Sequence, residues 1–120
     1  MAVNRRLTSF HFPYLPLHLL VLVGRRSTDV EALLDTGFDG DVAVPPEVLS
    51  GQSPNEYVIW TLADGSPVLA PAFVATAQLG DLDPFPVLVT ALGDEPLIGR
   101  GVSDRFKVTL DHGYQVIVEP

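Results

Sequence analysis

Short apolar segments, separated by glycine, proline and polar turns, run along most of the chain. Residues 15–23 are mainly Leu and Val, a polar turn follows at 24–28, and residues 29–34 alternate before becoming wholly apolar. Segments this short and this rich in β-forming residues favour strands over helices. Two of them joined by a polar turn predict a hairpin whose second strand enters the core. Pro16 indicates that the first strand lies at an edge or begins there.

The same pattern predicts further strands and two short helical pieces. We expect strands at 42–44, 57–62, 67–70, 73–79 and 85–90, a terminal hairpin from 108–110 and 114–118, a helical turn at 46–49, and one short helix near residues 101–106. Asp64-Gly65 is a strong two-residue hairpin signal, so a projecting hairpin is expected around it. Residues 1–11 are mixed and polar, and predict an N-terminal arm that frays or pairs with something else. The predicted fold class is all-β.

Length and charge narrow the class of protein. The chain has 120 residues, of which 47% are hydrophobic, so we expect a single domain over residues 1–120 with one core. Its net charge is −8, and Lys107 is the one lysine in the sequence. A nucleic-acid partner is therefore not expected, because phosphate binding requires clustered Lys and Arg.

The chain contains no cysteine, which removes disulfides, thiolate zinc sites and a cysteine nucleophile. A reducing compartment fits this composition, and the expected location is cytoplasmic. Arg5 and Arg6 precede the apolar residues 12–23 in the order of a signal peptide. Prolines interrupt that stretch, no small-residue cleavage site follows, and it is too short to cross a bilayer, so no membrane partner is expected.

Asp35-Thr36-Gly37 is the motif with the most chemical content. Three residues alone are a weak signal, since average composition gives this match by chance in roughly a few per cent of chains of this length. Here Leu33 and Leu34 bring a predicted strand directly to the carboxylate. A carboxylate at the end of a buried strand costs free energy unless it is hydrogen-bonded or shared. The alternative interpretation is an Asx-type turn at a strand end.

Over residues 15–118 the sequence resembles the single-lobe, bacterial-type retropepsin-like aspartic proteases. The segment 32–42 is similar to the family's pattern of apolar residues, Asp-Thr-Gly, one variable residue and Asp. The segment 96–100, Pro-Leu-Ile-Gly-Arg, is similar to its apolar-apolar-Gly element with a following basic residue and short helix. The 60–68 hairpin lies where the family has its flap. The resemblance implies a closed, barrel-like acid-protease lobe with a flap hairpin.

The resemblance also implies roles for individual residues. It makes Asp35 catalytic together with Thr36, which would hydrogen-bond its counterpart across a dimer, and Gly37, which would let the substrate backbone approach. Contacts with substrate are implied for Gly37, Phe38, Asp39, Ala63, Asp64, Gly65 and Ile98. Structural support is implied for Gly99 and for Arg100, which would pair with Asp39.

Charge then predicts the mechanism that this family uses. Two nearby carboxylates share one proton, so one can activate a water while the other polarises the scissile carbonyl, and neither a metal nor a cofactor is needed. The chain has a single Asp-Thr-Gly, so a two-fold homodimer must supply the second carboxylate. The implied function is an aspartic endopeptidase that acts on an extended peptide or protein substrate. The alternative is a catalytically weak, protease-like dimerisation or peptide-binding module.

Two positions depart from the family's pattern, and other site types fit poorly. Relatives often have Ala where this chain has Phe38, and a side chain where it has Gly40, which implies a narrower pocket and a more mobile loop. An EF-hand counted from Asp35 would need Glu where Pro46 stands. The three histidines are not spaced as metal ligands, and Ser66 is not in the Gly-x-Ser-x-Gly motif of a serine hydrolase. Gly99 and Gly101 lack the third glycine of a dinucleotide-binding motif.

Overall fold

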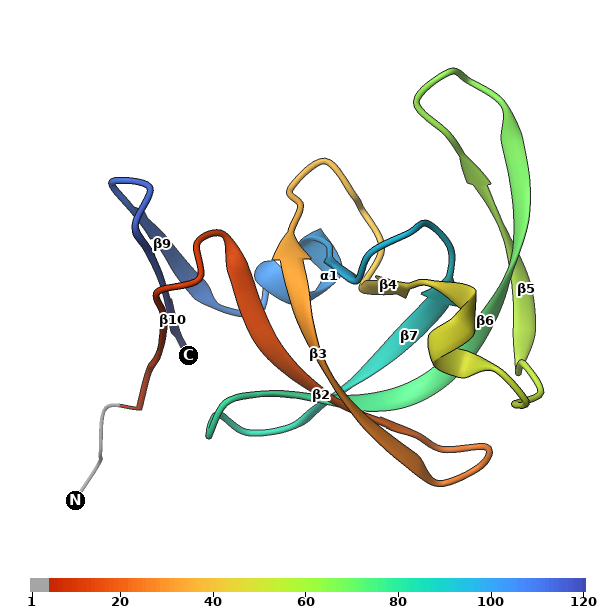
Figure 1. The fold of residues 1–120 in the computed structure, drawn as a ribbon, viewed down its shortest axis with the longest axis horizontal. Helices are drawn as coiled ribbons and strands as arrows, with labels where there is room; N and C mark the ends of the chain where they lie inside the picture. The colour runs from red at the N-terminus through yellow and green to blue at the C-terminus, as the bar shows by residue number, and fades with distance from the viewer. Residues whose placement is uncertain (1–4) are drawn as a thin grey trace.

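Ten strands and two short helical elements make up the chain in the computed structural model, which describes residues 5–120 (Figure 1). The strands are β1 (Leu7–Ser9), β2 (Tyr14–Val21), β3 (Arg26–Leu34), β4 (Val42–Val44), β5 (Glu56–Thr61), β6 (Pro67–Leu79), β7 (Phe85–Ala91), β8 (Leu97–Ile98), β9 (Lys107–Asp111) and β10 (Gln115–Glu119). The helical elements are the 3-10 turn η1 (Pro46–Leu49) and α1 (Arg100–Ser103). The expected all-β class is confirmed.

Six strands close into a barrel. Hydrogen bonding runs in the order β2-β3-β8-β4-β7-β6, and β6 pairs back with β2. β5 pairs with the first half of β6 and stands outside the closed ring. Because the ring closes, none of its six strands presents a bare edge along its full length.

Alternating side chains fill the barrel. In β2 every second residue, from Leu15 to Val21, points inward and is at most 1% exposed. β6 and β7 contribute Ala75, Ala77, Leu79 and Val89 to the same core. The period-two pattern of the sequence is thus the pattern of a strand with one face buried.

The first predicted hairpin is confirmed, and Pro16 has a clear place in it. β2 pairs with β3 over its whole length, but its pairing with β6 begins only at Leu17. β2 is therefore not an edge strand. Pro16 lies just before the second ladder begins, where a missing N–H breaks no bond to β6.

A smaller sheet lies at one end of the barrel and joins the two ends of the chain. Its strand order is β1-β10-β9, with Leu7 opposite Val118 (Figure 1, left). The expected N-terminal arm over residues 1–11 is therefore strand β1 for residues 7–9, paired within its own chain. Residues 1–4 of that arm lie outside the described residues.

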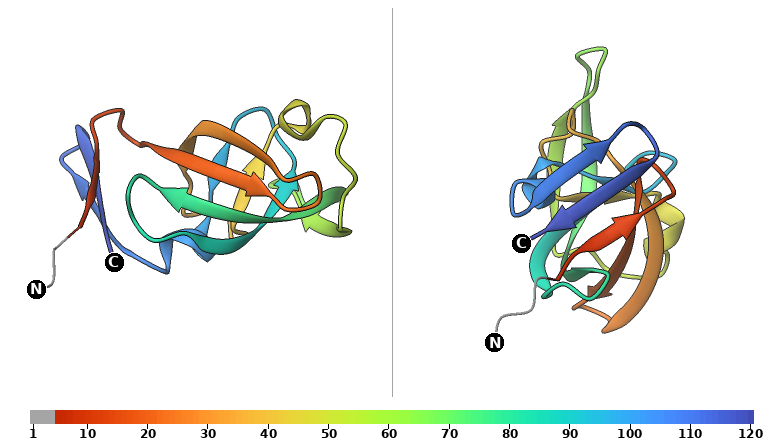
Figure 2. Two further views of the ribbon diagram at one scale, coloured as in Figure 1. Left: turned by 90° about the horizontal axis from the view of Figure 1, so that it is seen from below. Right: turned by 90° about the vertical axis from the view of Figure 1, so that its left-hand side faces the viewer.

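The β5–β6 hairpin projects from the barrel on the side where the loop 35–41 also emerges (Figures 1 and 2). Its register pairs Thr61 with Pro67, and the turn between them is closed by the bond from the Leu62 amide to the Ser66 carbonyl. Gly65 takes a left-handed φ of 87° there, as a hairpin turn requires. The hairpin expected at Asp64-Gly65 is confirmed.

The short helix and strand β6 differ from the sequence-based expectation in ways that have a structural reason. The short helix spans 100–103, with Gly99 as its N-cap, so 104–106 is a turn and not helix. The strands expected at 67–70 and 73–79 form the single 13-residue strand β6. Pro71 does not break it, because pairing with β7 starts only at Ala72.

Among residues 5–120, no helix has the length and apolar character needed to cross a membrane.

Candidate active site

Asp35 lies where β3 leaves the barrel. Its amide donates a hydrogen bond of 2.9 Å to the carbonyl of Ile98, which continues the parallel pairing of β3 with β8 by one residue. The side chain is partly buried, and its Oδ1 accepts a bond of 2.9 Å from the amide of Gly37. The barrel therefore fixes the backbone of Asp35, while its carboxylate stays accessible.

Three main-chain hydrogen bonds hold the loop 35–41 against the segment after β8. The amides of Gly99, Arg100 and Gly101 donate to the carbonyls of Asp41, Phe38 and Gly40, at 2.9, 2.8 and 3.0 Å. This ladder is the contact between the two motifs that carry the family resemblance. It joins the loop 35–41 to residues 99–101, about sixty positions later in the sequence. These two segments together form one rigid unit, which we call the base of the site.

Glycine is required at two positions of this base. A β-carbon at Gly99 would overlap the carbonyl oxygens of Gly40 and Phe38, and one at Gly101 would overlap the Asp41 carboxylate. The supporting role predicted for Gly99 therefore has a steric basis, because the two segments approach backbone to backbone.

The ion pair expected between Arg100 and Asp39 is not formed. The three ion pairs within residues 5–120 are Arg5–Asp83, His18–Asp29 and His112–Asp111. Arg100 and Asp39 are both exposed, and what Arg100 contributes to the loop is its amide. Two exposed long side chains gain little from pairing in water, so the main chain is the stronger support.

Asp41 supports the loop in a way that the sequence did not reveal. Its Oδ2 accepts a 2.9 Å hydrogen bond from the amide of Leu88 in β7, and the same side chain packs against Gly101. In the sequence, Asp41 lies within the segment 32–42 that resembles the family's motif, with no predicted role of its own. A signal was nevertheless present, because an acid immediately before an apolar strand has a neighbouring amide to satisfy.

Ile98 is not a surface residue. It was expected to contact substrate, but it is 1% exposed and belongs to the barrel core. The correction follows from strand alternation, since β8 points Ile98 inward and offers only its carbonyl, to Asp35. Thr36 and Gly37, in contrast, are exposed beside Asp35.

The tip of the β5–β6 hairpin, Ala63 to Gly65, is exposed and distant in sequence from the base. Asp64 organises it, because its Oδ1 accepts bonds from the Ser66 hydroxyl and the Ser66 amide at 2.5 and 2.9 Å. These bonds, that of the hydroxyl above all, lower the pKa of Asp64 from its usual value of 3.8.

Phe38 and Trp60 connect the hairpin with the base. Their ring centroids are 5.1 Å apart and the planes are inclined by 53°. Phe38 follows Gly37 directly, and Trp60 comes from β5, so the contact joins the loop that carries Asp35 to the hairpin. Tilted rings at this distance attract each other beyond simple apolar burial.

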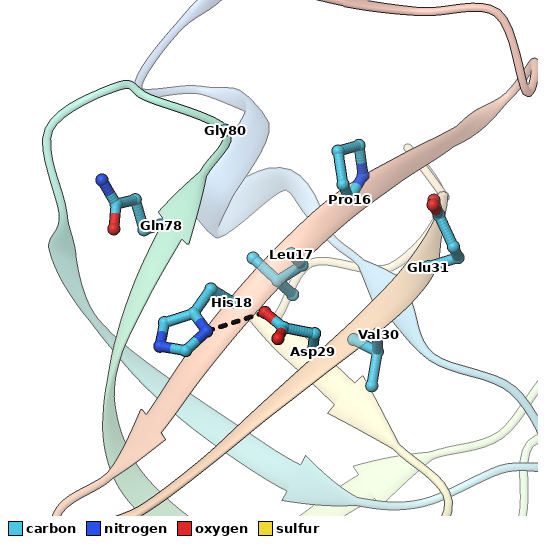
Figure 3. A pocket seen from close by; sticks show the side chains of 8 residues that line it. All are labelled: Pro16, Leu17, His18, Asp29, Val30, Glu31, Gln78 and Gly80. Carbon is cyan, nitrogen blue, oxygen red and sulfur yellow. Dashed lines mark hydrogen bonds and ion pairs between the residues drawn. The ribbon is translucent and has the colours of Figure 1, made fainter.

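A pocket of about 340 Å³ lies away from this arrangement, on the outer face of the barrel (Figure 3). Its walls come from β2, β3 and the end of β6, and His18 Nδ1 lies 2.7 Å from Asp29 Oδ1 inside it. None of the predicted site residues lines it. Asp35 is thus the better guide to chemistry than this concavity.

Within residues 5–120, no three His, Asp or Glu side chains are grouped so as to hold a metal ion. Two of the three acidic residues of the loop 35–41 are instead engaged separately, Asp35 with Gly37 and Asp41 with Leu88, while Asp39 is exposed.

The fold is similar to that of a known enzyme. The chain resembles the crystal structure of a retropepsin-like aspartic protease from Rickettsia conorii, with a TM-score of 0.57 and 15% sequence identity over 98% of this chain and 94% of the other. No protein-family model matches the sequence, and no curated protein matches it. The chain therefore has the fold of a retropepsin-like single lobe: an all-β closed barrel with one short helix.

Proposed function

We propose that this chain is an aspartic endopeptidase that works as a homodimer. The observation that carries the proposal is the position of Asp35. An accessible carboxylate follows a barrel strand, its backbone is fixed by Ile98, and it lies within an Asp-Thr-Gly motif on a retropepsin-like fold. A turn that served only to reverse the chain would need neither the bond from Asp35 to Ile98 nor the ladder between the loop 35–41 and residues 99–101.

The chemistry follows from two such carboxylates facing each other. When two acids lie within a few ångströms, both cannot ionise easily, so the pair holds one proton. The ionised Asp35 removes a proton from a water molecule, and the protonated Asp35 of the partner donates a hydrogen bond to the scissile carbonyl. The Gly37 amide, bonded to Oδ1, keeps the carboxylate oriented for this exchange.

Dimerisation is part of the proposal because each chain contributes one Asp-Thr-Gly. The Thr36 side chain is exposed and forms no hydrogen bond within residues 5–120, which leaves it available for a bond across the two-fold axis. The β1-β10-β9 sheet offers a second contact region, since its outer strands each have one partner in the described part of the chain. Unpaired strand edges readily add another strand.

An extended peptide fits between the base and the two hairpins. The hairpin rises on the same side as the loop 35–41, and its tip at Ala63, Asp64 and Gly65 is free (Figure 1). Exposed main-chain groups on such elements recognise a peptide as an added strand. Substrate contacts through Phe38 and Asp39 follow from their place directly after Gly37.

Digestion of a diverse peptide pool tests the proposal. Wild type, Asp35→Asn and the control Asp104→Asn, an exposed acid after α1, are compared from about pH 4 to about pH 7, where acid dyads work. We expect cleavage by wild type and by the control, none by Asp35→Asn, and sedimentation of the active species as a dimer. Cleavage that survives in Asp35→Asn would refute the assignment.

A strict monomer that cleaves nothing would instead favour a protease-like peptide-binding module. In that case Asp35→Asn would leave peptide binding intact, because an uncharged amide of the same shape keeps the bond from Gly37. Peptide binding by all three proteins without cleavage by any of them therefore indicates the binding module, whereas cleavage by wild type and by Asp104→Asn but not by Asp35→Asn indicates the enzyme.

A further inference from the structure

Two aromatic rings meet at the loop that carries the proposed catalytic residue. Phe38 belongs to the loop that follows Asp35, and its ring meets Trp60 of β5 at 5.1 Å. Both side chains are only partly buried, so the pair also faces solvent. The contact spans the gap between the base and the hairpin, where the proposed substrate would lie.

Gly40 shows how tightly this space is filled. A β-carbon on Gly40 would lie 2.5 and 2.8 Å from Cζ and Cε1 of Phe38, and 2.8 Å from Cη2 of Trp60. Its backbone has no left-handed φ that would demand glycine. Gly40 is therefore small because the two rings lie over it, and the residues at 38, 40 and 60 form one packing unit.

The unit is held by ring packing and not by a hydrogen bond. Within the described residues, the indole N–H of Trp60 is buried and has no acceptor. A buried donor without a partner lowers stability, so the ring contact must offset that loss. Packing of its ring against Phe38 over Gly40 therefore helps to hold the Trp60 side chain in place.

We propose that Phe38 and Trp60 form a wall that admits only small side chains, such as Gly, Ala or Ser, at the substrate position next to the scissile bond. The inference rests on the proposed endopeptidase function and adds a substrate class to it. Phe38 is separated from Asp35 by two residues, so the volume its ring takes is volume that a neighbouring substrate side chain cannot use. Trp60 blocks the way out of that volume toward the hairpin.

Substitution of Phe38 tests the wall directly. We expect Phe38→Ala to raise the preference for Leu or Phe over Ala at that substrate position by about tenfold or more, the scale on which a few methylenes discriminate in a pocket. Trp60→Phe should keep the preference for small residues, because the ring remains and no hydrogen bond is lost. The matched control is Ile59→Ala, whose side chain is 71% exposed on the same strand and should leave selectivity unchanged.

Binding to Asp35→Asn separates this inference from the proposed function. Peptides with Ala or Phe at the tested position are titrated against Asp35→Asn and against Asp35→Asn with Phe38→Ala. Preferential binding of Ala peptides that Phe38→Ala reverses supports the wall, even if wild type cleaves nothing. Equal binding of both peptides to Asp35→Asn, or tighter binding of the Phe peptide to it, overturns the proposed wall. Cleavage by wild type would in that case still support the endopeptidase function. Binding of neither peptide overturns the wall as well.

Trp60 reports on the wall without any substrate, because it is the one tryptophan in the sequence. We expect Phe38→Ala, and Gly40→Ala, which pushes a methyl group into both rings, to shift Trp60 emission to the red and increase its quenching by acrylamide. Ile59→Ala should change neither property. Unchanged Trp60 emission in both variants would show that the rings do not hold each other, and would overturn the inference.

Discussion

The loop 35–41 and the β5–β6 hairpin face each other across the proposed cleft, but they are held in different ways. The loop is fixed by a ladder of main-chain hydrogen bonds to 99–101 and by glycines that permit backbone contact. The hairpin beyond Trp60 has only its own cross-strand bonds and those that Asp64 makes at its tip. The main-chain ladder fixes the position of the loop 35–41, whereas the ring contact between Phe38 and Trp60 allows the hairpin to move relative to that loop.

The largest effect is expected where the base is tightest. Gly101→Ala should lower the free energy of unfolding by about 3 kcal/mol or more, because its β-carbon would overlap the Asp41 carboxylate and the barrel cannot yield without moving the loop. Gly24→Ala is the control, since its nearest neighbours would be in ordinary contact at 3.5 Å. Urea denaturation measures both variants, and equal stability would show that the base is not rigid.

Two acids of the same loop allow a sharper comparison. Asp41→Ala should cost about 1–2 kcal/mol, because the amide of Leu88 loses its acceptor in a partly buried place. Asp39→Ala should change stability by less than about 0.5 kcal/mol, since Asp39 is exposed and forms no ion pair within the described residues. Thermal or urea unfolding measures both variants. If Asp39→Ala lowered stability more than Asp41→Ala, the expected ion pair of Asp39 with Arg100 would be supported after all.

On the hairpin, loss of an aromatic ring should act locally. Trp60→Ala should cost about 1 kcal/mol, less than for a fully buried ring, because the side chain is only partly buried. Hydrogen exchange should accelerate at the amides of β5 and the start of β6 and stay unchanged in β2. Leu69→Ala serves as the control, because Leu69 lies on the same hairpin and is 65% exposed. Equal acceleration in the barrel would mean that hairpin and base unfold together.

The smallest expected effect concerns pH at the hairpin tip. Bonds from the Ser66 hydroxyl and amide lower the pKa of Asp64, so the folded tip favours the carboxylate. The contribution to stability is complete above the unfolded pKa of about 3.8 and is lost as pH falls through the lower folded value. Carbon-detected NMR titration should give a pKa below 3.8 for Asp64, and Ser66→Ala should raise it. An unchanged pKa in Ser66→Ala would contradict the Asp64–Ser66 bond.

Sequence predicted the parts of the fold that local chemistry determines. Asp64-Gly65 specifies a tight turn by itself, and short apolar segments between polar turns specify strands, so the hairpins and the class followed. The single strand β6 was predicted as two strands, because the effect of Pro71 depends on which neighbouring ladder is present at that point, and the pairing of β6 with β7 begins one residue later. Such information belongs to the sheet and not to the segment.

The site shows the same division. The motif gave the place of Asp35, but the support of its loop depends on contacts between 35–41 and 96–101 that no local pattern contains. The family resemblance implied a pair of Arg100 with Asp39, and the structure has Asp41 bonded to Leu88 instead. A substrate contact was expected for Ile98, which is buried, because the motif does not say which face of a two-residue strand is inside.

The pairing of β1 with β10 also has a consequence for synthesis. Leu7 leaves the ribosome early and Val118 late, so β1 must wait without its partner while all the barrel strands emerge. The pairing of β1 with β10 closes the longest loop of the chain and forms last. The entropy cost of closing that loop is offset by strand pairing only once β10 has been made. If the terminal sheet serves in dimerisation, a nascent or truncated chain cannot assemble. The proposed protease would then remain inactive until translation through β10 is complete.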